Sequence, residues 1–262
     1  MITQGSPMAS RFVATALILS LAATGCSGPQ SPNPSSPGAD AASEAPASSD
    51  AATETLGAGE RDLEAGTYRV DLTAIAGGAD YTPFHVTVPD GWSSIDGWVL
   101  NGSAGEAGPP VSIAFWNVDQ VYGHPCQWDG TLSDPGSGVE ELVAALVQVP
   151  SRDPTEPITV EMDGRPGMYL EWSVPENLAF DEDGNFPECD GDGEGHFDFR
   201  SWTGTGWAST RYHQGPGQID RLWVLDVHGQ RLVIDAFSMP GATGDEIAEM
   251  LTVVESVEFL DG

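Results

Sequence analysis

The sequence contains no lysine, and its nine basic residues are all arginines, against 40 aspartates and glutamates. The absence of lysine excludes a Schiff-base lysine, a Walker lysine and a lysine general base. The formal net charge of −31 argues against a nucleic-acid partner, because phosphate backbones bind to basic surfaces. The sequence also lacks a Gly-x-Ser-x-Gly elbow and a His-Glu-x-x-His motif. It therefore predicts no cofactor and no familiar catalytic centre.

The N-terminal region has only a short apolar run. Residues 12–23 follow Arg11 and are too few to cross ~30 Å of hydrocarbon as a helix. A short apolar run that ends in small residues is typical of a secretory signal peptide. The start of the chain is either Met1 or Met8.

The end of this run, Thr24-Gly25-Cys26, resembles the lipobox of bacterial lipoproteins, although Ala23 stands where that motif usually has Leu or Val. The resemblance implies a signal peptide over residues 1–25 and diacylglycerol on the Cys26 thiol. A palmitate-bearing anchor would then hold the protein on the extracytoplasmic face of the cell membrane. An ordinary cleaved signal peptide is the alternative.

Residues 26–60 are rich in Pro, Ser, Ala, Gly and acidic residues, with Leu56 as their one large aliphatic side chain. Such a composition buries too little apolar area to offset its ordering entropy, so we expect a disordered linker. Its root-mean-square span would be roughly 30 Å.

Residues 61–262 are predicted to form one extracytoplasmic domain, since the chain as a whole is 40% hydrophobic. Strands are predicted where apolar and polar residues alternate, or where apolar residues occupy both faces of a segment. These segments are residues 67–72, 84–88, 111–118, 158–162, 167–174, 197–202, 221–227 and 230–238. Asp163-Gly164 and His228-Gly229 predict hairpin turns. Helices are expected at 139–149 and 244–257, with capping pairs Ser137/Glu140 and Thr243/Glu246, before a last strand at 257–260. The fold class is α+β, with a mostly antiparallel sheet that is covered on both faces.

Two resemblances accompany this pattern. The segment FHVTVPDGW (residues 84–92) and the terminal hairpin–helix–strand resemble the Mog1/PsbP-like α/β/α sandwich. Five segments resemble uncharacterised secreted or lipid-anchored proteins of actinobacteria: LEAGTYR at 63–69, PCQW at 125–128, FRSW at 199–202, RYHQGPG at 211–217 and DRLWVLD at 220–226. No activity is implied by either resemblance.

Apart from Cys26, the sequence contains two cysteines, Cys126 and Cys189. An even pair in an exported protein predicts a disulfide. The alternative, a free thiol nucleophile or metal ligand, is disfavoured because no Cys-x-x-Cys is present and an exported thiol tends to oxidise.

The polar segment 211–221 contains the best candidates for a ligand site. His213 is the strongest general-base candidate, with Asp220 and Ser209 nearby in sequence. A turn between strands is the structural alternative. The candidate ligand-binding residues are Arg211, Tyr212, His213, Gln214, Gln218, Asp220 and Arg221.

Two further site hypotheses concern calcium and glycan. Asp190, Asp192 and Glu194 fit positions one, three and five of an EF-hand register, but Ser201 stands where the bidentate glutamate belongs, so a solvated acidic loop is the alternative. Exposed tryptophans stack on sugars, and Trp207 is the expected exposed member of the eight, whereas Trp116 and Trp223 are expected in the core.

The sequence thus predicts a non-enzymatic, lipid-anchored module that binds a ligand or a cell-envelope partner, protein or glycan. A cell-envelope hydrolase that uses His213 and a nearby carboxylate is the alternative. The sequence leaves the oligomeric state open.

Overall fold

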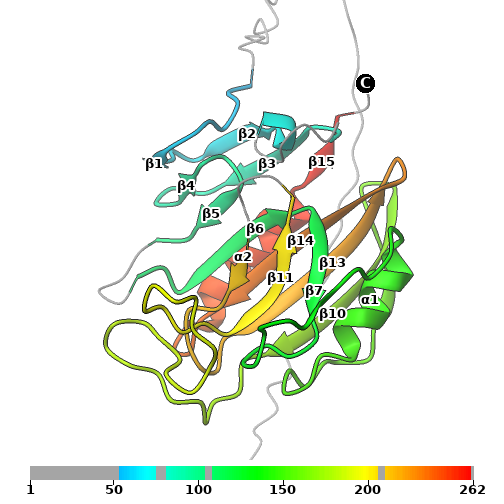
Figure 1. Cartoon of the computed structure of the whole chain (residues 1–262). Coiled ribbons are helices and arrows are strands. Elements are labelled where there is room, and N and C mark those ends of the chain that lie inside the picture. The colour runs from blue at the N-terminus through cyan, green and yellow to red at the C-terminus, as the bar shows by residue number, and fades with distance from the viewer. Residues whose placement is uncertain (1–52, 75–80, 104–107, 206–209, 261–262) are drawn as a thin grey trace, which may run out of the picture. The chain divides into compact units, whose positions relative to one another are not determined.

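Antiparallel strands with apolar side chains on both faces form the centre of the fold. The computed structural model describes residues 53–74, 81–103, 108–205 and 210–260, which all belong to one unit, Asp50–Gly262. Its main sheet has eight strands in the order β1-β4-β5-β6-β14-β13-β10-β9 (Figure 1). They are β1 (Glu60–Asp62), β4 (Ser93–Ile95), β5 (Val99–Asn101), β6 (Val111–Trp116), β14 (Gln230–Ser238), β13 (Ile219–Val227), β10 (Arg165–Ser173) and β9 (Ile158–Met162).

Two smaller sheets accompany the main sheet. One has the order β12-β11-β7-β8, with β12 (Arg211–Tyr212), β11 (Arg200–Gly204), β7 (Val118–Tyr122) and β8 (Leu132–Ser133). The other has the order β15-β3-β2, with β15 (Glu258–Phe259), β3 (Phe84–Val88) and β2 (Gly66–Val70). Within the described residues, the helical segments are the 3₁₀ turn Leu72–Ala74, α1 (Val139–Val147) and α2 (Gly244–Glu255).

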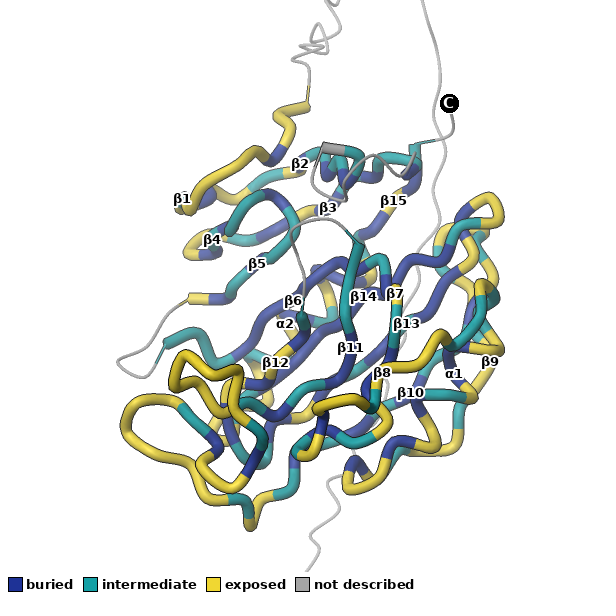
Figure 2. Tube along the Cα trace, viewed as in Figure 1, coloured by how far each residue is buried: buried dark blue, intermediate teal, exposed yellow. Residues whose placement is uncertain are grey.

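Each face of the main sheet packs against one helix and one small sheet. Leu142 and Leu146 of α1 share a buried cluster with Trp202 of β11 on one face. Met250 and Val254 of α2 share another cluster with strands β2 and β3 on the opposite face. Figure 2 shows the result as continuous burial along the middle strands of the sheet, with exposure at its outer strands. The expected α+β class and double coverage are therefore confirmed.

The strand register decides which side chains share a face. Asp235 lies between Ala114 of β6 and Leu222 of β13. Asp220 lies opposite Phe237. Because directly paired residues project to the same face, the two aspartates lie on the side covered by α1 and β11.

The beginning of the fold differs from the sequence expectation. Leu56 is only 3% exposed, and backbone hydrogen bonds join its N–H to the Arg69 carbonyl and the Arg69 N–H to the Glu54 carbonyl. The last residues of the expected linker therefore pack with the domain. Among the described residues, no helix is long and apolar enough to cross a bilayer.

The two helix caps also differ from each other. The Thr243 pair is confirmed: the Glu246 N–H donates to Thr243 Oγ1 at 3.2 Å, and the Thr243 N–H donates to Glu246 Oε2 at 2.7 Å. The Ser137 prediction is wrong by one residue. Gly138 is the N-cap of α1, and its N–H donates to Glu141 Oε2 at 2.8 Å.

Candidate functional site

The predicted ligand-binding segment divides between the interior and the surface. Arg211, His213, Gln218 and Asp220 converge in the interior, each 3% exposed or less. Tyr212 is 54% exposed and Gln214 is also exposed. Arg221 projects from β13 to the face opposite Asp220, where its Nε lies 3.9 Å from Glu171 Oε1. The structure thus brings together four of the seven candidates as a buried group. Three of the seven, Arg211, Tyr212 and Gln214, line a cavity beside that group.

Two residues outside the predicted segment complete this group. Arg211 donates from Nε to Asp235 Oδ2 at 2.6 Å and from Nη2 to Asp220 Oδ1 at 3.0 Å. Arg152 donates from Nη2 to Asp220 Oδ2 at 2.5 Å. We refer to Arg152, Arg211, Asp220 and Asp235 as the buried charge cluster. With two guanidinium groups and two carboxylates, it is electrically balanced when all four are ionised.

Aromatic rings surround the cluster. The Arg152 guanidinium lies 4.0 Å from the ring centroid of Trp172 and 5.3 Å from that of Phe199. The Arg211 guanidinium lies 4.4 Å from the Phe237 centroid. A planar guanidinium suits this setting because it stacks on rings while it donates in its own plane.

Burial shifts the titration of these groups. Burial raises the pKa of Asp235 from 3.8 to about 7, against the opposing effect of Arg211. Burial lowers the pKa of Arg152 to about 10, against the attraction of Asp220. The pKa of His213 lies well below 6.5 because of burial and the nearby charges of Arg152 and Arg211. His213 is therefore neutral at pH 7.

Three residues have the connectivity of a Ser-His-Asp triad. Ser201 Oγ lies 2.6 Å from His213 Nε2, and His213 Nδ1 lies 3.4 Å from Asp220 Oδ2. Ser201 is a member that sequence reasoning missed. Ser209, the serine considered from the sequence, lies outside the described residues.

Gln218 holds His213 in a tautomer that cannot act as a general base toward Ser201. The backbone N–H of Gln214 donates to Gln218 Oε1 at 2.9 Å, which turns Nε2 of the amide toward His213 Nδ1 at 3.1 Å. Nδ1 must then accept, so the ring proton lies on Nε2 and is donated to Ser201. In this tautomer His213 cannot take the Ser201 proton, and Ser201 itself is 0% exposed.

A cavity of about 520 Å³ lies beside the charge cluster, over β5, β6 and β14. Its apolar lining includes Trp98, Val99, Ala114, Trp116, Phe237 and Met239. The Trp98 and Trp116 rings meet edge to face, with centroids 4.9 Å apart. The buried charged side chain in its wall is that of Arg211. This size and lining suit a small, mainly apolar molecule.

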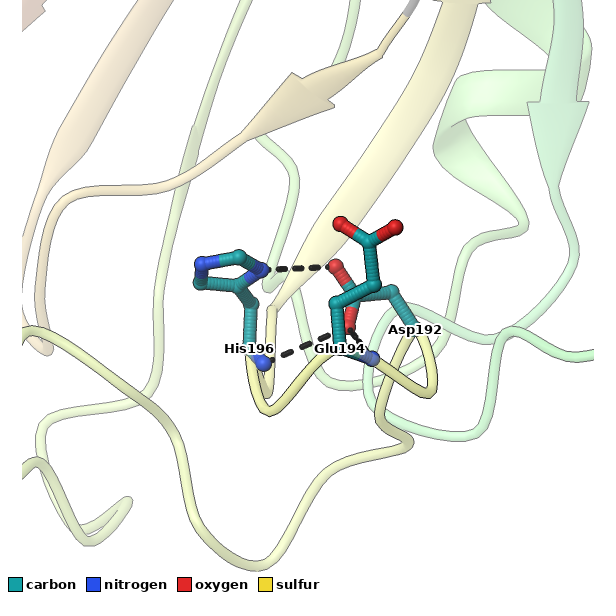
Figure 3. A group of neighbouring side chains, drawn as sticks. All are labelled: Asp192, Glu194 and His196. Atoms are coloured by element: carbon teal, nitrogen blue, oxygen red, sulfur yellow. Dashed lines mark hydrogen bonds and ion pairs between the residues drawn. The ribbon is translucent and has the colours of Figure 1, made fainter.

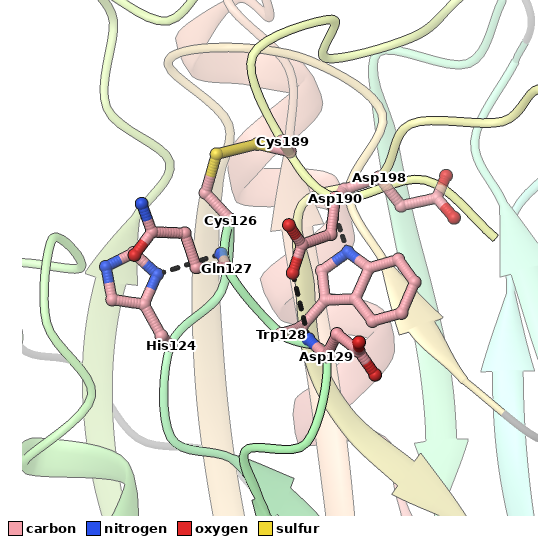
Figure 4. The surroundings of a disulfide bond; sticks show 8 residues. All are labelled: His124, Cys126, Gln127, Trp128, Asp129, Cys189, Asp190 and Asp198. Atoms are coloured by element: carbon pink, nitrogen blue, oxygen red, sulfur yellow. Dashed lines mark hydrogen bonds between the residues drawn. A yellow bond between two sulfur atoms is a disulfide. The ribbon is translucent and has the colours of Figure 1, made fainter.

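The predicted disulfide is confirmed. Cys126 and Cys189 are bonded, and the Asp190 N–H donates to the Cys126 carbonyl at 2.8 Å. Figure 4 shows the neighbouring contacts, in which Asp190 Oδ2 accepts the Asp129 N–H at 2.9 Å. The disulfide thus anchors the acidic loop to the segment between β7 and β8.

The acidic loop does not form the expected EF-hand arrangement. Ligand atoms of Asp192, Glu194 and His196, all exposed, lie within 4.8 Å of one another (Figure 3). Asp190 points elsewhere, because its Oδ2 accepts the Asp129 N–H at 2.9 Å. Ser201, at the twelfth position, is buried in β11. The hydrogen bond from His196 lowers the pKa of Asp192 to about 2, and this pairing also raises the pKa of His196.

The described tryptophans are not exposed platforms for sugar. Trp98 and Trp223 are half-buried. The others are buried: Trp92, Trp116, Trp128, Trp172 and Trp202. The core expectation is confirmed for Trp116, while Trp207, the expected exposed ring, lies outside the described residues.

Comparisons with known proteins give no family. No protein-family model matches the sequence, and no curated protein does. Among solved structures, the solution structure of cyanobacterial PsbP (CyanoP) from Synechocystis sp. PCC 6803 is similar at 14% identity, over 76% of this chain and 95% of that chain, with a TM-score of 0.31. The resemblance to actinobacterial envelope proteins stays a prediction.

Proposed function

We propose that this protein is a lipid-anchored, extracytoplasmic module that binds a small, mainly apolar ligand without chemical conversion. The observation that carries the binding role is the aromatic-lined cavity of about 520 Å³ beside the charge cluster. The finer architecture we propose is a Mog1/PsbP-like α/β/α sandwich, supported by the placement of α1 and α2 on opposite faces of the main sheet.

A filled-cavity variant tests the binding role. Ala114 is 3% exposed in the cavity wall, and Ala144 is exposed on α1. We expect the uncharged probe N-phenyl-1-naphthylamine to fluoresce on binding to the protein carrying Cys26→Ser, purified without detergent. Ala114→Leu should weaken this binding at least fivefold, while Ala144→Leu should leave it unchanged. Equal binding by both variants would refute the cavity as the site.

The anchor is tested separately. Cells that express the protein are labelled with radioactive palmitate, and we expect label in the wild type and none in Cys26→Ala. Label that persists in Cys26→Ala, together with membrane association, would show that the lipobox interpretation is wrong.

The hydrolase alternative depends on the contact between Ser201 and His213. The burial of Ser201 and the tautomer of His213 argue against it. A fluorophosphonate reagent that labels the wild type but not Ser201→Ala would favour the hydrolase.

A cell-envelope protein partner remains compatible with an anchored module. A glycan partner is a second proposal, and it depends on Trp207, which lies outside the described residues.

A further inference from the structure

The buried charged group in the cavity wall, Arg211, is already paired with carboxylates of the protein. Arg211 is 3% exposed, and its guanidinium contacts carboxylates of both Asp235 and Asp220. Asp220 also pairs with Arg152. Above pH 7, where Asp235 is ionised, two positive and two negative groups therefore balance within the cluster, and the neighbouring His213 is neutral.

An ionised ligand would meet this balanced environment without a counter-ion. Transfer of a charge from water into an apolar site is unfavourable unless an opposite charge compensates it. A carboxylate next to Arg211 would compete with Asp235 for the same guanidinium, and the two carboxylates would repel each other. An uncharged ligand meets neither obstacle and gains from contact with Trp98, Trp116 and Phe237.

We infer that the cavity selects uncharged, mainly apolar ligands, and that Asp235 is the specificity residue that excludes carboxylates by neutralising Arg211. This inference rests on the proposed function and names the ligand class of that site. Asp235 acts through Arg211 and is not itself among the lining side chains.

The titration of Asp235 supports this role. The charged groups that face it are Arg211 of β12, Asp220 of β13 and Arg152 of the turn after α1. On β6 its paired neighbour is Ala114, which carries no charge. Because the pKa of Asp235 is raised to about 7, mild acid protonates it and leaves the two arginines with one carboxylate. The cavity should then admit an anion.

The test uses two ligands of nearly equal shape, 2-ethylnaphthalene and 2-naphthoate, with quenching of tryptophan fluorescence as the readout. At pH 8.5 we expect wild-type protein carrying Cys26→Ser to bind the neutral compound at least tenfold more tightly than the anion. Asp235→Asn should bring the anion within about threefold of the neutral compound, whose own affinity stays the same within about twofold.

Two controls isolate the role of Asp235. Glu60→Gln removes an exposed carboxylate that also lines the cavity, and Asp62→Asn removes one on the same strand, β1, that does not line it. Neither change should admit the anion. Should Asp235→Asn fail to fold, wild-type protein at pH 5.5 serves instead, since naphthoate remains ionised there and should bind more tightly than at pH 8.5.

The outcomes distinguish failure of the proposed ligand site from failure of its proposed selectivity against anions. Absence of binding by both compounds would refute the proposed ligand site itself. Equal binding of both by the wild type at pH 8.5 would overturn the selectivity and leave the site standing. Admission of the anion by Glu60→Gln alone would assign the exclusion to Glu60 and overturn the role of Asp235.

Discussion

Single residues decide the stability of the buried charge cluster. Burial of a charge is unfavourable unless it is paired and hydrogen-bonded, so each member depends on the others. Arg152 is 0% exposed, and its guanidinium lies close to the rings of Trp172 and Phe199. Loss of its guanidinium would leave Asp220 with less compensation in an apolar setting.

We expect Arg152→Met to lower the free energy of unfolding by about 3–5 kcal/mol, because it breaks a buried ion pair. Arg61→Met is the matched control: Arg61 pairs with Glu54 at the surface, where an ion pair contributes at most about 1 kcal/mol. Urea unfolding of both variants is the measurement. Similar losses in the two variants would contradict the special role of Arg152.

The pH dependence of stability should report Asp235. The ordinary pKa of an aspartate, 3.8, applies to Asp235 in the unfolded chain, whereas its pKa in the folded protein is about 7. Between these two pH values, Asp235 is ionised in the unfolded protein and protonated in the folded protein. Folding stability from this group therefore falls as pH rises from about 4 to 7. His213 acts in the opposite sense: its folded pKa is lowered, so the unfolded state protonates first and stability is lost as pH falls below about 6.5.

In the wild type these two effects oppose each other between about pH 4 and 6.5. Asp235→Asn removes the contribution of Asp235, which falls as pH rises. The free energy of unfolding of the variant, minus that of the wild type, should therefore increase as pH rises from about 4 to 6.5, by at most about 1.4 kcal/mol per pH unit. Urea titrations at several pH values measure the difference, in which the titration of the many surface acids largely cancels. A flat difference would mean that Asp235 titrates normally.

Sequence reasoning found part of this group. Arg211, His213, Gln218 and Asp220 lie in one short polar segment, which is why they attract attention together. Asp235 carried a usable signal, since it is an acid within a strand that is apolar on both faces. Arg152 carried none, because it stands in a turn after Pro150, where an arginine is usually solvated.

At the scale of elements, the length of a strand determined whether it could be predicted from the sequence. Strands β6, β10, β13 and β14 are long enough for a clear pattern, and the predicted positions agree closely with the structure. Strands of two or three residues have too few positions to show a period. The unpredicted short strands are β1, β4, β5, β8 and β12; five-residue β7 also escaped prediction. Four of these short strands, β1, β4, β5 and β12, contribute residues to the cavity wall, which explains why the sequence did not show the cavity.

The cap of α2 offers an element-scale prediction. Thr243→Ala should lower the free energy of unfolding by about 1 kcal/mol, because the Glu246 N–H loses its acceptor. Thr252→Ala, on the exposed side of the same helix, should change it by less than about 0.5 kcal/mol. Thermal unfolding of both variants provides the comparison, and a larger effect at Thr252 would contradict it.

At the scale of the whole molecule, the disulfide links two segments 63 residues apart in sequence. Closing a loop of this length restricts the unfolded chain, so the Cys126→Ser/Cys189→Ser variant should be less stable by about 4 kcal/mol in the chain-entropy model. Urea unfolding of oxidised, reduced and doubly substituted protein measures this. The reduced protein should behave like the double variant; if neither differs from the oxidised form, the cross-link does not stabilise the fold.

The balance of the buried charge cluster has a consequence for how this sequence can diverge. A single replacement of Arg211 or Asp235 passes through a state with an unmatched interior ion, whereas a joint change to two neutral residues avoids it. We therefore expect positions 211 and 235 to change together among homologous sequences, as arginine with aspartate or as an uncharged pair. Homologues that keep only one of the two should be rare and should carry a new counter-ion nearby.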